Sequence, residues 1–232
     1  MAIDLQQSFL ERFPKNFLEE FSRRQFPIYK HAIAISHPDE WDTPEVASVL
    51  PIIRRAMMEK AFRSAAVAAG LKPHNTPHAG DNCSCVMVKS GAMIITEHFV
   101  EGPGQFVRAA KSRDQNRGVN QWVMEHIDPR LLRESPPTLG NHPTYFYLLH
   151  GAHFQTSSSG ITEVDESSCF LRIAIPDSEA DEYLFNWSVQ ELLQAYSAMK
   201  IESTGPHIIE DKAVPRTKVK IKAAKNAVGK TE

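Results

Sequence analysis

The sequence predicts an α+β fold, in which a mainly antiparallel sheet of about four strands packs with helices, between an N-terminal helical segment and a flexible basic C-terminal arm. Apolar residues recur at helical spacing through about the first 70 residues. Short β-branched and aromatic runs, bounded by Gly, Pro and Ser clusters, follow from residue 83 onward. We expect one domain over residues 1–205, with its helical part over about 1–70, and a disordered tail over 206–232.

An apolar stripe with a four-residue repeat predicts the first helical segment, over residues 4–24. Asp4 stands where an N-cap is expected, and Pro14 interrupts the pattern, so we expect a kink or two short helices that meet there. The stripe packs on the core or on a second copy of the chain, which makes a homo-oligomer through this segment one interpretation. Its phenylalanines are Phe9, Phe13, Phe17 and Phe21.

A second helix is predicted from Thr43 to Gly70. Thr43 followed by Pro44 is the order of an N-cap and a first helical residue. Gly70, with Leu71 behind it, is typical of a Schellman C-terminus. The inward stripe is expected to consist of Ile53, Met57, Ala61, Ala65 and Ala69.

The strands are predicted in the middle and late parts of the chain. A hairpin is expected over residues 83–100, because Gly91 permits the positive φ of a tight turn. Two further strands are expected over 145–149 and 169–175, which are rich in β-branched and aromatic residues. Additional helices are expected over 105–126 and 178–200, and a polar loop over 155–160.

The charge of the chain is distributed unevenly. Residues 212–232 hold seven of the 26 Lys and Arg residues but only one of the 28 Asp and Glu residues. A basic arm on an acidic body is typical of a segment that contacts nucleic acid or an acidic protein surface. A solvated end without a partner, or docking onto the chain's own acidic body, is the alternative. The residues expected to make the contact are Arg216, Lys218, Lys220 and Lys222.

A second basic segment lies inside the domain. Its composition, with amide side chains among the basic ones, suits contact with phosphate. At helical rotation these side chains do not form a single face, so a solvated, charged helix is the alternative interpretation. The basic residues are Arg108, Lys111, Arg113 and Arg117.

Histidines near the ends of predicted strands suggest acid–base chemistry. Glu97 and His98 close the hairpin, and His150 closes the next strand. Side chains of these types transfer protons near neutral pH when they lie within hydrogen-bond reach of one another. His153 is separated from His150 by an odd offset, which places the two rings on opposite faces of a strand. The candidate catalytic group is therefore Glu97, His98 and His150.

One cluster has the residue types of a zinc site. Two imidazoles and two thiolates would satisfy tetrahedral zinc. However, only one residue separates the two cysteines, whereas structural zinc sites favour two to four. The alternative is a histidine-containing loop that leads into a core strand, and no cofactor is expected in that case. The four residues are His74, His78, Cys83 and Cys85.

Several classes of protein are not indicated by the sequence. It has no GxxxxGK, GxGxxG, HExxH or GxSxG motif. The opening residues lack the pattern of a signal peptide, and no apolar run is long enough to predict a membrane span. Three cysteines, Cys83, Cys85 and Cys169, do not form a disulfide framework. We expect a cytoplasmic protein with reduced thiols and no membrane contact.

Two functions remain open at this level. The first is a non-catalytic interaction or regulatory protein that works in a complex and contacts nucleic acid through the arm and the segment 108–117. The second is a hydrolase-type enzyme that acts on a phosphorylated or nucleotide substrate with a His/Glu acid–base site.

Overall fold

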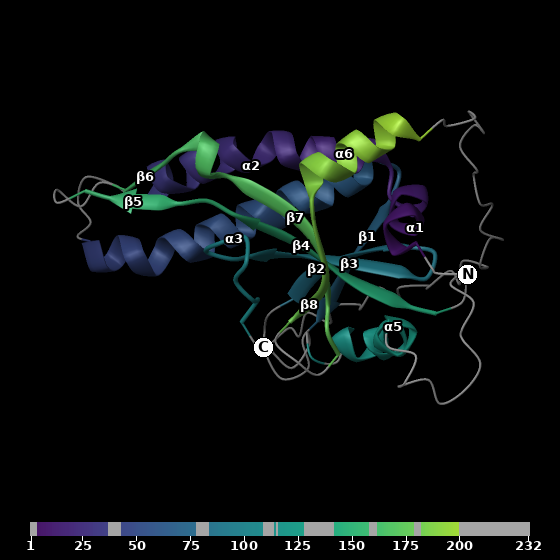
Figure 1. The fold of residues 1–232 in the computed structure, drawn as a ribbon. Coiled ribbons are helices and arrows are strands. Elements are labelled where there is room, and N and C mark those ends of the chain that lie inside the picture. Colours follow the sequence, from purple (N-terminus) through teal and green to yellow (C-terminus); the bar gives the residue numbers. More distant parts are fainter. Residues whose placement is uncertain are drawn as a thin grey trace, which may run out of the picture. The chain divides into compact units, whose positions relative to one another are not determined.

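The computed structural model describes residues 4–36, 43–77, 84–108, 114, 116–127, 142–157, 162–178 and 182–199 (Figure 1). All of them belong to one compact unit. The predicted tail over 206–232 lies outside the described residues, so its disorder stays a prediction.

A six-stranded mixed sheet forms the centre of the fold, with the strand order β1-β2-β3-β4-β7-β8. All neighbours are antiparallel except β3 and β4, which are parallel. The predicted α+β class is confirmed, but the prediction of about four mainly antiparallel strands is wrong in number and in direction. Parallel neighbours need a long crossover, and the chain between β3 and β4 supplies one. The strands are β1 (Lys72–Pro77), β2 (Ser84–Ser90), β3 (Met93–Phe99), β4 (Thr144–Gly151), β7 (Phe170–Pro176) and β8 (Tyr183–Ser188).

Two strands lie where other structure was expected. β1 contains Pro73 and Pro77 and was expected to be a loop, but it is an edge strand, where proline is tolerated. β8 occupies the first part of the helix predicted over 178–200. The helix begins only at Val189, because Ser188 and Glu191 form a capping box.

Two further predictions are corrected in the connecting segments. The loop predicted over 155–160 includes part of a small hairpin of β5 (Phe154–Thr156) and β6 (Thr162–Val164). The helix predicted over 105–126 is shorter, because residues 105–108 are not helical. Its described helical part comprises residues 114, 116 and 117, the 3-10 turn η1 (Gly118–Asn120) and α5 (Gln121–Ile127).

The N-terminal helices agree with the pattern. α1 (Leu5–Arg12) and α2 (Lys15–Ser36) meet at Pro14, and Asp4 caps α1 through a 2.9 Å bond from the Gln7 amide. α2 continues beyond the predicted boundary to Ser36. No helix among the described residues is long and apolar enough to cross a membrane.

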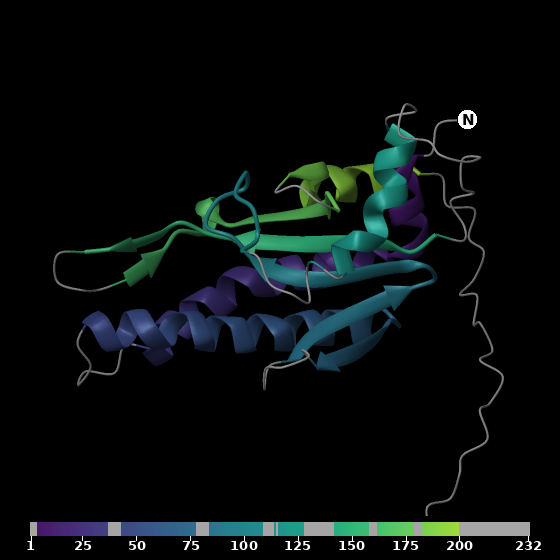
Figure 2. The same cartoon turned by 90° about the horizontal axis from the view of Figure 1, so that it is seen from below.

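The third helix, α3 (Thr43–Ala68), ends as predicted. Gly70 has a φ of 75°, and the Leu71 amide bonds the Ala66 carbonyl at 2.8 Å, which completes a Schellman motif. α2 and α3 lie side by side along one face of the sheet (Figure 2). The predicted inward stripe is correct at Ala61 and Ala65, which are buried, and Ala69 packs partly buried against the core. The other buried positions of α3 are Val46, Met58, Phe62 and Ala66.

The phenylalanine stripe lies in the main core. Phe9, Phe13, Phe17 and Phe21 are all fully buried against the sheet and α3 within one chain. Phe9 packs 5.2 Å from Phe146 of β4, measured between ring centroids. These side chains are therefore not available as an interface with a second copy, and the predicted oligomer contact through them is not supported. Truncation of a core phenylalanine of this kind to alanine lowers the free energy of unfolding by about 3–5 kcal/mol.

Candidate functional site

A cleft of about 560 Å³ lies beside the carboxyl ends of β3 and β4, and we call it the first cleft. Because these two strands are parallel, their last residues reach the same end of the sheet. α3 forms the facing wall with Arg54, Arg55 and Glu59. Glu97 and His150, from the two strands, lie at its base.

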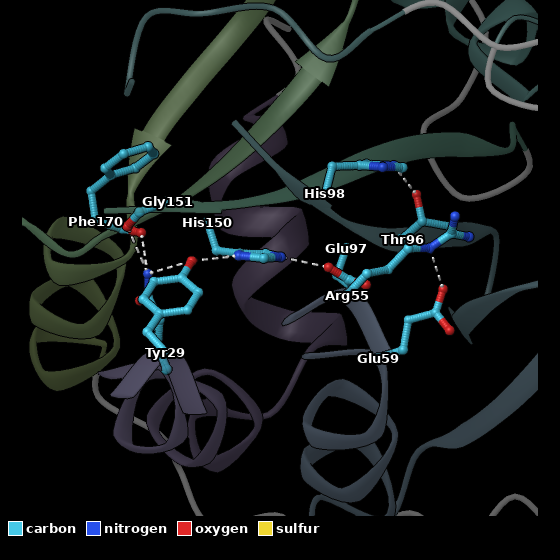
Figure 3. Close-up of polar contacts among 10 residues, drawn as sticks. Tyr29, Arg55, Glu59, Thr96, Glu97, His98, His150, Gly151 and Phe170 are labelled. Atoms are coloured by element: carbon cyan, nitrogen blue, oxygen red, sulfur yellow. Dashed lines mark hydrogen bonds and ion pairs between the residues drawn. The ribbon is translucent and has the colours of Figure 1, made fainter. Parts of the chain in front are cut away.

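Glu97, His150 and Tyr29 form a chain of hydrogen bonds (Figure 3). Glu97 Oε2 lies 2.6 Å from His150 Nε2, and the Tyr29 hydroxyl lies 2.8 Å from His150 Nδ1. The three residues come from β3, β4 and α2. The side chain of His150 is only 1% exposed and that of Glu97 is 7% exposed, so water does not screen these contacts.

With Glu97 ionised and His150 neutral, the hydrogen bonds select one imidazole tautomer. An ionised Glu97 only accepts, so the Nε2–H of His150 donates to it. In neutral His150 the other nitrogen, Nδ1, then accepts, and the Tyr29 hydroxyl donates to it. Burial raises the pKa of Tyr29 well above its ordinary value, so the hydroxyl keeps its proton. Tyr29 therefore sets the imidazole tautomer that holds the carboxylate.

Gln25 holds the far end of this chain. Its Nε2 donates to the carbonyls of Gly151 and Phe170, both at 2.9 Å, and lies 3.4 Å from the Tyr29 hydroxyl. These carbonyls belong to a paired position at the ends of β4 and β7. The amide thus fixes α2 against the strand that carries His150.

Gly151 is required beside His150 for lack of space. A Cβ at this position would lie 2.1 Å from the Val100 carbonyl oxygen, far below any contact distance. The close approach is held by the bond of the Val100 amide to the His150 carbonyl, at 3.0 Å. Glycine here lets the end of β3 pack tightly on the end of β4.

The sheet places His98 apart from the other two members of the predicted catalytic group, Glu97 and His150. Successive residues of a strand point to opposite faces, so Glu97 and His98 diverge. His98 bonds Thr96 Oγ1 at 2.7 Å and packs on Tyr147 with 4.6 Å between ring centroids. The structure therefore brings Glu97 and His150 together, and leaves His98 at the border of the cleft on the other face of β3.

A second carboxylate faces the same space. Burial raises the pKa of Glu59 above its ordinary value, and the nearby charge of Glu97 acts in the same direction. An ion pair with Arg55, 3.3 Å from Arg55 Nε to Glu59 Oε1, opposes this shift. The two glutamates thus occupy different environments, which is the arrangement that separates an acid from a base.

Arg54 projects from α3 between two aromatic rings. Its guanidinium carbon lies 3.4 Å from the centroid of Phe99 and 5.2 Å from that of Phe154. Burial lowers the pKa of Arg54, but a guanidinium stays charged at any ordinary pH. The first cleft therefore carries a fixed positive charge next to three carboxylates, those of Glu59, Glu97 and Glu101.

The residues predicted to contact nucleic acid are only partly described. Arg108 is exposed and borders the first cleft. Arg117 Nε lies 3.4 Å from Asp114 Oδ1 and its side chain is 15% exposed, so it is engaged inside the chain. The remaining members, Lys111, Arg113, Arg216, Lys218, Lys220 and Lys222, lie outside the described residues.

The predicted zinc cluster is also only partly described. His74 lies on β1 and Cys85 on β2. The register places His74 opposite Met87 and Cys85 opposite Thr76, so the two residues do not face each other across the pair of strands. His78 and Cys83 lie outside the described residues. Within the described ranges, no group of three His, Cys, Asp or Glu side chains is placed to hold a metal ion.

Sequence reasoning missed Gln25, Tyr29, Arg54 and Glu59. A signal for the first two is present, because the four-residue repeat of phenylalanines that ends at Phe21 continues at Gln25 and Tyr29. Polar groups on the buried side of a helix need partners. Comparison of the chain with models of known protein families, with curated proteins and with solved structures gives no significant match, so no role is transferred to these residues from a relative.

Proposed function

We propose that the protein is a hydrolase-type enzyme that acts on a phosphorylated or nucleotide substrate in the first cleft. The observation that carries the proposal is the buried Tyr29–His150–Glu97 chain, which ends in a carboxylate beside arginines. A buried polar chain costs desolvation free energy, so its presence at a cleft favours a role in positioning.

In this proposal Glu97 is the general base. It accepts a proton from a water molecule while the water oxygen attacks the phosphorus atom. His150 and Tyr29 hold the carboxylate in one orientation, and they act as positioning residues. Proton transfer of this kind contributes about 10²–10⁴-fold to the rate.

Glu59 is the general acid of the same reaction. Because burial raises its pKa, Glu59 binds a proton more readily than an ordinary glutamate does, and in this reaction it gives a proton to the leaving ester oxygen as the bond to phosphorus breaks. The products are an alcohol and a phosphate, and the proton gained by Glu97 balances the one lost by Glu59. Arg54, Arg55 and Arg108 supply positive charge for the phosphate oxygens.

Hydrolysis of a panel of phosphate esters tests the proposal. The panel holds an aryl phosphate monoester, an aryl phosphate diester, nucleoside monophosphates and a short oligonucleotide, and product release is measured for each. We expect turnover of at least one class by the wild type and its loss in Glu97→Gln, whereas Glu19→Gln, an exposed site on α2, retains it. Turnover of none of the classes, or equal turnover by Glu97→Gln, contradicts the proposal.

The basic arm supports a second proposal, contact with nucleic acid, which rests on its charge alone. Binding of labelled duplex and single-stranded nucleic acid is compared across a salt series for the full chain and for a chain that ends at Asp211. We expect affinity that falls steeply with salt and is lost with the arm. Binding that does not depend on salt contradicts this proposal.

A further inference from the structure

A second cleft of about 440 Å³ adjoins the first. The two share Arg54, Phe99 and Glu101, so the space is continuous along these residues. One wall of the second cleft is apolar and comes from α3, with Val46, Ala47 and Leu50. The opposite wall comes from the β5–β6 hairpin and the segment before it.

Arg54 stands at the junction of the two clefts. The Phe99 and Phe154 rings hold its guanidinium in place by cation–π contact. Among the described residues it has no hydrogen bond and no ion pair, although it carries five N–H donors. The Glu101 carboxylate acts on this charge from nearby. Donors that are fixed in position and make no hydrogen bond to the described part of the chain suit a bound anion, and a planar guanidinium pairs with phosphate through two parallel bonds.

The second cleft has the composition of a site for a flat organic group. Its apolar wall suits the faces of an aromatic ring. The rest of its lining is partly polar: Thr156 and Thr162 place their hydroxyl oxygens 3.1 Å apart, and His153 and Glu101 add an imidazole and a carboxylate. Such groups accept and donate to sugar hydroxyls or to the edge of a base.

We infer that the ligand of the two clefts is a nucleoside phosphate, with its phosphate on Arg54 and its nucleoside in the second cleft. The inference rests on the proposed function only for the reaction at the phosphate. Binding of the nucleoside is measured without turnover, so the inferred ligand and the proposed hydrolysis are tested separately.

Calorimetric titration of the full chain tests the inference with five probes: adenosine 5′-monophosphate, uridine 5′-monophosphate, ribose 5-phosphate, adenosine and inorganic phosphate. We expect at least one nucleotide to bind about tenfold or more tightly than ribose 5-phosphate and than inorganic phosphate, because the base adds apolar contact. If neither nucleotide binds more tightly than ribose 5-phosphate, the inference is overturned.

Two variants locate the two halves of the ligand. Arg54→Gln weakens nucleotide binding about tenfold or more, toward the affinity of the nucleoside, while the charge-matched control Lys60→Gln, exposed on α3, leaves it unchanged. Ala47→Trp fills the second cleft from an exposed position, so it weakens nucleotide binding and spares ribose 5-phosphate. Equal nucleotide binding by wild type and Ala47→Trp overturns the placement of the nucleoside, and circular dichroism verifies that each variant folds.

The same data separate this inference from the proposed function. Nucleotide binding that depends on Arg54 and Ala47, together with no Glu97-dependent hydrolysis, supports the inferred binding site and contradicts the proposed hydrolase activity. Glu97-dependent hydrolysis of aryl phosphates without any preference for nucleotides supports the proposed hydrolase activity and overturns the inference.

Discussion

The two faces of β3 carry two hydrogen-bonded chains that differ in chemistry. On the face toward α2 and α3, Glu97 bonds His150, which bonds Tyr29. On the opposite face His98 bonds Thr96, which bonds the Tyr145 hydroxyl at 2.7 Å. Each chain contains one histidine and one tyrosine. The residues that β3 contributes, Thr96, Glu97 and His98, alternate between its two faces.

The carboxylate makes the difference between the two chains. Among the bonds between described residues, the chain toward α2 ends in an acid, Glu97, which faces a second glutamate and the arginines of α3 across the cleft. The described bonds on the other face join hydroxyls and an imidazole, and they stabilise the packing of β3 on β4. The comparison shows that the partner of a histidine, rather than the histidine itself, decides which face can support acid–base chemistry.

The largest expected effect is a difference in hydrolytic rate between variants of two neighbouring residues of β3. Glu97→Gln removes the base and should lower the hydrolytic rate by about 10²–10⁴-fold. Thr96→Val keeps the shape of its side chain on the other face and should change the rate by less than about threefold, because it does not act on the carboxylate. Steady-state rates of both variants on the best substrate of the panel measure the difference. Equal losses would remove the distinction between the faces.

A backbone change tests how tightly the functional face is built. Gly151→Ala places a methyl group against the Val100 carbonyl and should lower the free energy of unfolding by about 1–3 kcal/mol. Gly104→Ala is the matched control, since no atom lies within 4 Å of its added Cβ. Denaturant unfolding of the two variants measures the contrast. A Gly151→Ala variant as stable as the wild type would show that the approach of β3 to β4 is loose.

Much of the fold was predictable because its signals are local. The break at Pro14, the Schellman end at Gly70 and the hairpin at Gly91 each depend on a few adjacent residues, and each was predicted at the correct place. β1 and β8 were missed because their assignment depends on neighbours in the sheet. The prolines of β1 are tolerated because β1 is an edge strand. Pairing with β7 overrides the helical pattern of β8.

The candidate site was predicted in part for the same reason. Glu97 and His150 were selected because they end adjacent apolar strands, but the parallel pairing that joins them is a tertiary fact. His98 was included because its chemistry is right, and the pleat of β3 places it on the wrong face. Tyr29 lies 121 positions from His150 in the chain, and only the fold brings the two together.

The two tyrosines sharpen the comparison at a smaller scale. Tyr29→Phe leaves His150 Nδ1 without its donor and should cost about 1–3 kcal/mol of stability. It should also lower the hydrolytic rate and alter its pH profile, because the tautomer of His150 is no longer fixed. Tyr145→Phe removes a buried hydroxyl of the other chain and should reduce stability without altering the pH profile. Unfolding curves and pH–rate profiles of the pair distinguish positioning from packing, and identical profiles would contradict the role of Tyr29.

The smallest expected effect concerns the second glutamate. Because burial raises the pKa of Glu59, the folded chain binds that proton more tightly than the unfolded chain does. This stabilisation is fully present below the ordinary glutamate pKa of 4.5 and is lost as the pH rises through the folded-state pKa. Glu59→Gln, which mimics the protonated form, should therefore match the stability of the wild type in acid and exceed it slightly near pH 7. Thermal unfolding from about pH 4 to 8 measures the difference between the two proteins. A difference that stays constant with pH would mean that Glu59 does not carry a raised pKa, and the assignment of Glu59 as the acid opposite Glu97 would then lose its support.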